Sequence, residues 1–307
     1  MLVEHPKWNA QNHAEAIKKY APPEWDVEID WWTDRHSNFR YHDADVIVNL
    51  GSNAHKRLHR QCCAVAPDAL LISRYNTMYP RYEDKLRMLH ECSHLVLVEA
   101  LRCYQLARPR YNTIHLAPSG VDLEIFGHRV PPCRRPSKVL WTAGIKGQSP
   151  ERADVKRYKM ALKIAERLKA LGIEMEIAAV DPNGPECKGR DQMVDWYNSG
   201  RIYCCTSVME GLPNTCLEAA ACGCAVVTTP VGVMPELIKN GKNGFLVRVP
   251  TVDAFVDAIC EANQKYLQWQ YDIQQMIRPW DWRVKIGNYI QLIDQYICSR
   301  EDVGDLC

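Results

Sequence analysis

Residues 207–247 read SVMEGLPNTCLEAAACGCAVVTTPVGVMPELIKNGKNGFLV, and this stretch decides the fold. Its pattern predicts a strand ending at Thr206, a Gly-Leu-Pro turn, a helix of small residues over 215–222 and a second strand over 225–229. Asn214 and Thr215 have side chains suited to cap the start of that helix. A helix that starts at the carboxyl end of a parallel strand offers free N–H groups to an anion. The stretch therefore predicts a phosphate-binding unit of an open α/β sheet.

Two carboxylates flank this predicted helix start. Glu210 lies in the turn, and Glu218 follows eight residues later, about one turn inside the helix. Carboxylate oxygens accept hydrogen bonds from paired sugar hydroxyls, so the pair can bracket a ligand whose phosphates lie at the helix start. The spacing alone fits this function no better than a structural alternative, in which one carboxylate caps the helix and the other lies on its solvated face. The functional interpretation is favoured by the glycines that punctuate the unit, namely Gly211, Gly223, Gly232, Gly241 and Gly244.

Short β-branched runs alternate with amphipathic helical stretches from end to end, which is typical of parallel sheets with crossover helices. The expected strands are 27–31, 45–50, 69–73, 95–98, 113–117, 139–142, 174–180, 202–206, 225–229 and 245–247. In the second half the expected helices are 154–171, 191–198, 215–222, 252–266 and 283–297.

Three prolines within residues 130–137 (VPPCRRPS) interrupt this alternation and predict a linker. We therefore expect an α/β protein with two doubly wound, Rossmann-like domains. The predicted boundaries are 1–130 for an acceptor-side domain, 131–138 for the linker, 139–282 for a nucleotide-sugar-binding domain and 283–307 for a final helix and tail.

Composition narrows the class of protein. The 307 residues are 47% apolar and 24% charged, which excludes a disordered chain and suits about two domains. No apolar run reaches the roughly 18 residues that a membrane span needs, and the opening MLVEHPKW lacks the pattern of a secretion signal. The 14 cysteines cluster in apolar segments, as buried reduced thiols do, rather than in a disulfide framework. We expect a cytoplasmic protein, either free or peripheral to a membrane.

Charge is distributed unevenly along the chain. Residues 51–140 carry 14 Lys and Arg against 7 Asp and Glu, a net +7, whereas the whole chain has a net charge of +1. A solvated basic face explains this, and so does a surface for a polyanion such as nucleic acid or an anionic membrane. Both interpretations stay open.

The chain resembles the retaining glycosyltransferases of the GT-B fold, family 4, whose hallmark is E-x7-E followed by a helix of small residues. Glu210 and Glu218 have that spacing, and residues 235–244 (PELIKNGKNG) match the turn that follows. Residues 118–122 (PSGVD) with Phe126 resemble the segment before the family's linker. Residues 280–282 (WDW) resemble its closing element, which crosses back to the first domain. The landmarks occur in the expected order over most of the chain.

The resemblance implies a cleft between the two domains and transfer of a sugar from a nucleoside-diphosphate donor with retention of configuration. It implies that Glu218 holds the ribose hydroxyls and that Glu210 holds the transferred sugar. A departing diphosphate develops negative charge, so fixed cations and a helix start supply the stabilisation, and neither a metal nor another cofactor is required. The implied catalytic residues are Glu210, Lys156 and Arg152. The implied donor-binding residues are Gly144, Arg157, Gly211, Leu212, Pro213, Asn214, Thr215 and Glu218.

Some positions depart from the family's pattern. Ile145 stands where an arginine is common, and Arg157 replaces the usual glycine after the lysine. The first domain lacks the family's glycine pair and its histidine, so a sugar-nucleotide binding module without catalysis is an alternative function. The candidate acceptor-side residues are Asn9, Ser52, His55, Arg74 and Tyr75.

A competing motif lies at residues 90–94 (HECSH), which fit the zinc-protease pattern H-E-x-x-H. That site needs both histidines on one helix, but His94 runs directly into the predicted strand 95–98, so we expect no zinc site here. Asp43 and Asp45 resemble a metal-binding D-x-D clamp, yet they precede a strand rather than follow one. We interpret them as a pair of loop carboxylates.

Overall fold

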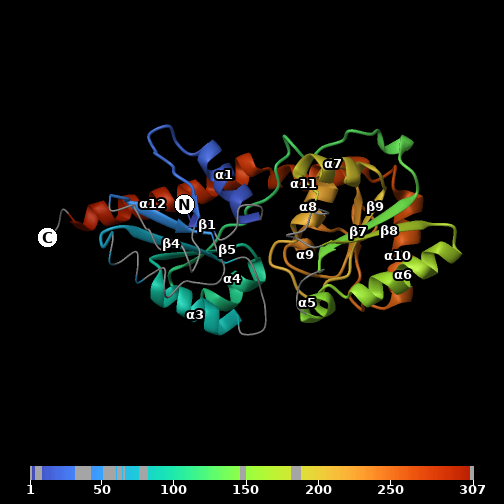
Figure 1. Cartoon of the computed structure of the whole chain (residues 1–307), viewed down its shortest axis with the longest axis horizontal. Helices are drawn as coiled ribbons and strands as arrows, with labels where there is room; N and C mark the ends of the chain where they lie inside the picture. Colours follow the sequence, from blue (N-terminus) through green and yellow to red (C-terminus); the bar gives the residue numbers. More distant parts are fainter. Residues whose placement is uncertain are drawn as a thin grey trace. The chain divides into compact units, whose positions relative to one another are not determined.

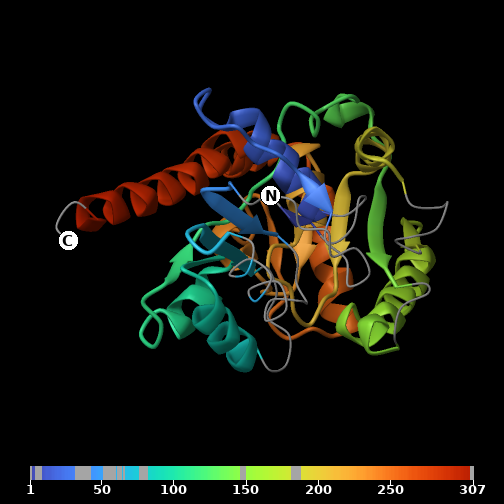
Figure 2. The same cartoon turned by 60° about the vertical axis from the view of Figure 1, so that its left-hand side comes forward.

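The computed structural model describes residues 2–3, 9–31, 43–50, 60, 64, 66–75, 82–145, 150–180 and 188–304. The chain forms two compact units, one made of Met1–Ser119 with Trp282–Cys307 and the other of Gly120–Asp281 (Figure 1). Both are α/β units built on parallel sheets, and their strands are also visible in the turned view (Figure 2). The predicted fold class is confirmed.

The first unit contains a parallel sheet with the strand order β2-β1-β3-β4-β5-β6 in the described part of the chain. The strands are β1 Leu2–Val3, β2 Asp30–Trp31, β3 Val46–Asn49, β4 Leu70–Tyr75, β5 Leu95–Val98 and β6 Ile114–Leu116. The helices are α1 Asn9–Tyr20, α3 Tyr82–Cys92, α4 Leu101–Ala107 and α12 Trp282–Gly304.

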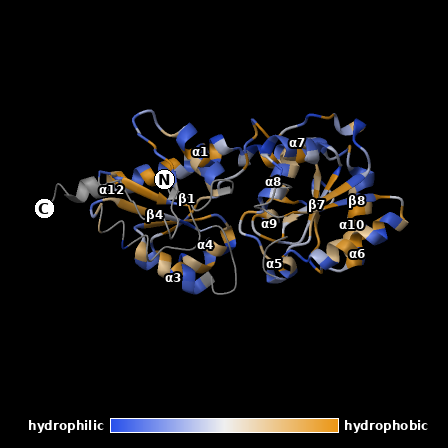
Figure 3. Cartoon of the chain, viewed as in Figure 1, coloured by the Kyte–Doolittle hydropathy of each residue, from blue (hydrophilic) through white to orange (hydrophobic). Residues whose placement is uncertain are grey.

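Helices cover both faces of this sheet. Strand β5 is apolar at every position: Leu95 and Leu97 pack in one core with α1 and α12, and Val96 and Val98 pack in another with α3 and α4. Side chains of a strand alternate between the two faces, so a strand buried on both sides has to be apolar throughout. Figure 3 shows hydrophobic strands and helices whose outer faces are hydrophilic.

The second unit contains a parallel sheet with the order β11-β10-β9-β7-β8. Its strands are β7 Lys138–Gly144, β8 Glu174–Val180, β9 Ile202–Cys205, β10 Ala225–Thr228 and β11 Gly244–Leu246. The chain passes from β7 to β8 on one side and then crosses to β9 on the other side of β7. This reversal makes a topological switch point between β7 and β9, and open α/β sheets bind ligands at the carboxyl ends of the strands at such a point.

The helices of the second unit pack on its sheet in two groups. Helices α6 and α10 pack together against the strands, whereas α8 packs with α7 and with α11. The helices are α5 Pro150–Val155, α6 Tyr158–Ala170, α7 Arg190–Asn198, α8 Asn214–Ala221, α9 Met234–Leu237, α10 Val252–Lys265 and α11 Gln270–Ile277, with 3-10 turns η1 Pro132–Arg134 and η2 Arg278–Trp280.

The boundary between the two units does not lie at the proline-rich segment 131–138, where the sequence predicted a linker. The chain divides between Ser119 and Gly120, so residues 131–138 lie inside the second unit. They include the 3-10 turn η1. The fully buried Arg135 holds this segment against the second unit by donating to Val130 O (3.0 Å) and to Asn198 Oδ1 (2.6 Å). The proline-rich segment is thus fixed to its own unit. The final helix α12 belongs to the first unit, as the resemblance implied.

Candidate functional site

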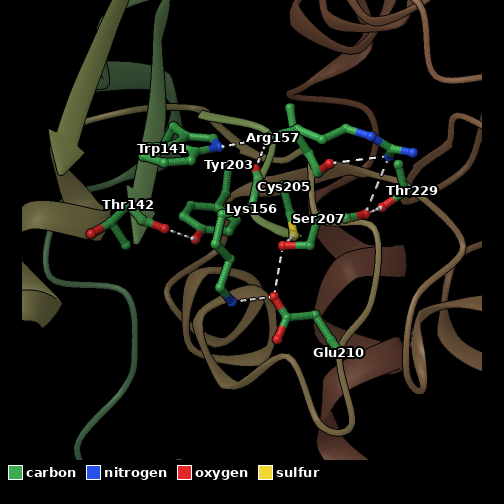
Figure 4. Close-up of polar contacts among 10 residues, drawn as sticks. Trp141, Thr142, Lys156, Arg157, Tyr203, Cys205, Ser207, Glu210 and Thr229 are labelled. Carbon is green, nitrogen blue, oxygen red and sulfur yellow. Dashed lines mark hydrogen bonds and ion pairs between the residues drawn. The ribbon is translucent and has the colours of Figure 1, made fainter. Parts of the chain in front are cut away.

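The switch point of the second unit gathers the predicted residues around the loop that follows β9. Lys156 forms an ion pair with Glu210 Oε1, and Ser207 Oγ donates to the same oxygen at 2.7 Å (Figure 4). The side chains of Lys156 and Glu210 are 20% and 17% exposed, so the pair is shielded but reachable by a ligand. Two residues that are 54 positions apart, and that the resemblance assigns to diphosphate and sugar, therefore lie in contact.

Lys156 is presented by a corner between α5 and α6 rather than by a continuous helix. The predicted helix 154–171 is wrong at this point, because Arg157 has a left-handed backbone with φ 48°. The loop after β9 donates hydrogen bonds to the carbonyls at the end of α5. Thr206 Oγ1 donates to Lys156 O at 2.7 Å, and Val208 N donates to Val155 O at 2.7 Å. Left-handed backbone favours glycine, so this geometry accounts for the glycine that the family prefers where this chain has Arg157.

The side chain of Arg157 points away from Glu210 and toward the backbone after β9 (Figure 4). Its guanidinium donates to the carbonyls of Thr206 (3.3 Å) and Ser207 (3.5 Å). Thr229 Oγ1 donates to the carbonyl of Ser207 as well, at 2.5 Å, and Trp141 Nε1 donates to Thr206 Oγ1 at 3.0 Å. Arg157 therefore braces the loop that carries Glu210.

The Gly-Leu-Pro turn (Gly211, Leu212 and Pro213) is buried, and it is held by a close backbone approach. A Cβ on Gly232, which has φ +51°, would lie 2.2 Å from Gly211 O and 2.8 Å from Pro213 Cδ. Only glycine fits there, which explains one of the punctuating glycines.

Helix α8 begins at Asn214, directly after that turn. The residue before the helix is Pro213, and no side chain caps the first turn. The predicted capping by Asn214 and Thr215 is therefore wrong. Two of the first N–H groups of α8 donate to backbone carbonyls, Asn214 N to Leu212 O and Cys216 N to Pro213 O, both at 2.9 Å. A helix start without a side-chain cap still presents the positive end of the helix dipole, which suits an anion.

Glu218 lies one turn inside α8 and is partly buried. Tyr197 of α7 donates its hydroxyl to Glu218 Oε2 at 2.8 Å. Burial raises the pKa of Glu218 to about 7, while the bond from Tyr197 and the charge of Arg190 oppose this rise. Arg190 also pairs with Asp122 at 2.8 Å. Sequence reasoning did not single out Tyr197 or Arg190, because an aromatic and a cation in an ordinary amphipathic helix carry no distinguishing signal.

Other predicted donor-side residues lie nearby along the chain. Gly144 ends β7 and is partly exposed, and Arg152 lies in α5. The roles assigned to these two residues stay predictions.

In the first unit, Arg74 and Tyr75 end β4 and are buried at 2% and 4% exposure. Arg74 donates twice to Glu99 Oε1, at 3.0 and 2.6 Å, and Ser119 donates to the same oxygen at 2.6 Å. Arg74 thus has an internal partner. Asn9 begins α1, and Ser52 and His55 lie outside the described residues. The acceptor-side roles of all five residues stay predictions.

The H-E-x-x-H motif is divided by the end of a helix. Helix α3 ends at Cys92, so His94 lies outside it, and His94 Nδ1 accepts a hydrogen bond from Leu71 N at 2.9 Å. His90 Nδ1 instead lies 2.7 Å from Thr113 Oγ1. Asp43 and Asp45 precede β3. Within the described ranges no three His, Cys, Asp or Glu side chains gather in a way that could hold a metal ion.

Two further sequence expectations concern thiols and membranes. The ten cysteines that the structure describes are all free. No helix among the described residues has both the length and the apolar character needed to cross a bilayer.

Comparison with known proteins agrees with this geometry. Residues 123–265 match the family model described as Glycosyl transferases group 1. The D-inositol 3-phosphate glycosyltransferase of Kribbella flavida is 34% identical over 95 residues, which is 31% of this chain and 21% of that relative. The enzyme of the same name from Streptomyces scabiei is 25% identical over 181 residues, 55% of this chain and 39% of the relative. The matched part thus spans well under half the length of these relatives.

Solved structures extend the similarity to nearly the whole chain. Anabaena HepE, solved in complex with UDP and glucose, superposes with a TM-score of 0.68 at 13% identity, covering 97% of this chain and 98% of HepE. The pneumococcal O-GlcNAc transferase GtfA, solved with UDP and GlcNAc, has a TM-score of 0.62 at 13% identity and covers 82% of this chain and 57% of GtfA. The chain therefore has the GT-B fold of glycosyltransferases. Residues 123–265, in its second unit, are similar to the family described as Glycosyl transferases group 1.

Proposed function

We propose that the protein transfers a sugar from a nucleoside-diphosphate sugar to an acceptor, with retention of configuration at the anomeric carbon. The observation that carries the proposal is the contact between Lys156 and Glu210 beside the uncapped start of α8, with Glu218 one turn further along that helix. A cation, a helix start and two carboxylates are the groups that a diphosphate flanked by two sugars needs. Relatives named glycosyltransferase support the same reaction class.

Each group has a proposed role. Lys156, Arg152 and the N–H groups of Gly211, Leu212 and Thr215 take the negative charge of the diphosphate, which grows as it leaves; Pro213 has no N–H, and that of Asn214 already donates to Leu212 O at 2.9 Å. Preorganised charges of this kind supply the largest share of stabilisation in many enzymes. Glu210 accepts hydrogen bonds from the transferred sugar, and Glu218 accepts them from the ribose. This chemistry proceeds without a metal.

UDP sugars are the donors that we propose to test first, since HepE is solved with UDP-glucose. For the acceptor we propose an anionic molecule such as a phosphorylated small molecule, a lipid or cell-envelope precursor, or a modified nucleic acid. The net charge of +7 over residues 51–140 supports this, and so do relatives named for D-inositol 3-phosphate. Attraction between such surfaces weakens with added salt.

The test is a binding and transfer assay on the full chain. We expect UDP and at least one UDP sugar to raise the unfolding temperature, since a ligand at 100 times its Kd adds about 2.7 kcal/mol of stability. With an acceptor found by screening, we expect NMR of the product to show the donor's anomeric configuration, EDTA to leave the rate unchanged and KM to rise with salt. Absence of binding by any nucleoside diphosphate would contradict the proposal. An inverted product would contradict retention alone.

A further inference from the structure

A buried tyrosine holds one of the two site carboxylates. Tyr197 is fully buried, and its hydroxyl donates to Glu218 Oε2 at 2.8 Å. Its ring is fixed by aromatic neighbours, with centroids 5.3 Å from Trp196, 5.8 Å from Tyr203 and 6.3 Å from Phe126. Cys224 further donates to the backbone carbonyl of Tyr197 at 3.1 Å. The hydroxyl therefore has a set position, which does not depend on a ligand.

The bond constrains Glu218 in two ways. It occupies Oε2, so Oε1 is the oxygen that Tyr197 leaves for a further hydrogen-bond donor. It also favours the ionised carboxylate, because a hydroxyl stabilises a charged acceptor more than a neutral one. Burial acts in the opposite direction and is the larger effect, since the pKa of Glu218 is raised to about 7. The charge state of Glu218 is thus balanced near neutral pH.

The other ionisable groups near Glu218 do not replace this bond. Arg190 lowers the pKa of Glu218 through its charge, but it is paired with Asp122 at 2.8 Å and its guanidinium lies 5.7 Å from the Phe126 ring centroid. Cys222, in the turn that ends α8, has a pKa raised by burial, so its thiol stays neutral. Burial also raises the pKa of Tyr197 well above its ordinary value, which keeps the hydroxyl a donor.

We infer that Tyr197 is a positioning residue of the donor site: its hydroxyl fixes the Glu218 carboxylate, and favours its ionised form, for the vicinal hydroxyls of a ribose. The inference rests on the proposed function for the identity of the ligand, but the bond itself can be tested without any ligand. A neutral carboxyl group has lost one acceptor and gained a donor, so it pairs less well with two hydroxyls. Binding of the nucleotide should therefore follow the ionisation of Glu218.

The first measurement is the titration of Glu218 in the full ligand-free chain, followed by NMR of ¹³C-labelled carboxyl groups and assigned by comparison with Glu218→Gln. We expect Tyr197→Phe to raise the midpoint by about one pH unit. The matched control is Tyr266→Phe, which removes an equally buried hydroxyl that has no hydrogen-bond partner in the described chain. The control should leave the midpoint where it is. An unchanged midpoint in Tyr197→Phe would overturn the inference.

The second measurement is the Kd of UDP between pH 6 and pH 9, by calorimetry. At pH 6 we expect Tyr197→Phe to bind UDP roughly tenfold more weakly than the wild type, at pH 7 about fivefold more weakly, and by pH 9 the difference should nearly vanish. A constant ratio at every pH would mean that Tyr197 supports only the packing, and the inference would fall. If the wild type binds no nucleoside diphosphate, the proposed function and the ribose role of Glu218 fall together, while the titration still decides whether Tyr197 controls Glu218.

Discussion

Replacing Glu210 by glutamine separates nucleotide binding from transfer. Glu210 pairs with Lys156, the cation that we assign to the diphosphate. A diphosphate has to compete with that carboxylate. Glu210→Gln keeps the size of the side chain and its bond from Ser207 but removes the charge, so Lys156 should bind UDP more tightly.

The expected change in the Kd of UDP depends on how far the ion pair between Lys156 and Glu210 is shielded from water. Hydrogen bonds that involve a charged group contribute about 1.5–3 kcal/mol. With side chains 20% and 17% exposed, we take the lower end of that range. Since about 1.4 kcal/mol corresponds to a factor of ten, the Kd of UDP should fall about tenfold. Transfer from a UDP sugar should fall at least about a hundredfold, because Glu210 no longer offers two charged acceptors to the sugar.

Calorimetry with UDP and a steady-state transfer assay, both at fixed salt, check the two halves of this prediction. Glu166→Gln, which removes a carboxylate from the exposed face of α6, is the matched control and should change neither quantity. Weaker or unchanged UDP binding by Glu210→Gln would refute the reasoning, since it would mean that Glu210 and the diphosphate do not compete for Lys156.

Three further predictions test the fold and the site by substitution. Glu218→Gln should stabilise the protein by about 3 kcal/mol at pH 8, since burial raises the pKa of Glu218 from 4.5 to about 7. In urea unfolding this gain should shrink from pH 7 down to pH 4.5, where native and unfolded chains both hold the proton. Gly232→Ala should destabilise the protein by about 2 kcal/mol in thermal unfolding, whereas Gly287→Ala, in open space on α12, should stabilise it by about 0.5–1 kcal/mol. Arg74→Met should cost about 3–5 kcal/mol by removing the cation that pairs with the buried Glu99, and adding Glu99→Leu should recover most of that loss in urea unfolding.

The strands and the donor-side carboxylates were predictable because their signals are local. Val96 and its apolar neighbours in β5 have to be buried on both faces, and the predicted strands 95–98 and 174–180 match the structure residue for residue. The spacing of Glu210 and Glu218 follows from one turn and one helix. Lys156 is 54 positions from Glu210, and only the resemblance connected the two.

What the sequence did not reveal depends on contacts between distant segments. The amphipathic pattern continues through Arg157, so the break between α5 and α6 is invisible until Thr206 is placed beside Lys156. The prolines near residue 131 suggested a linker, because the burial of Arg135 against Asn198 cannot be inferred from composition. Tyr197 likewise acts through its position in space, not through a motif.

The bracing of Lys156 and Arg157 by the loop after β9 also limits how this site can be re-engineered. The lysine's main-chain oxygen and the arginine's guanidinium are both tied to Thr206. A protein engineer could not transplant the lysine into another scaffold as a single substitution. Its backbone position depends on the loop at residues 206–208, and that loop is held in turn by Trp141 and Thr229. Substrate preference would be easier to alter in neighbouring loops that carry none of these bonds.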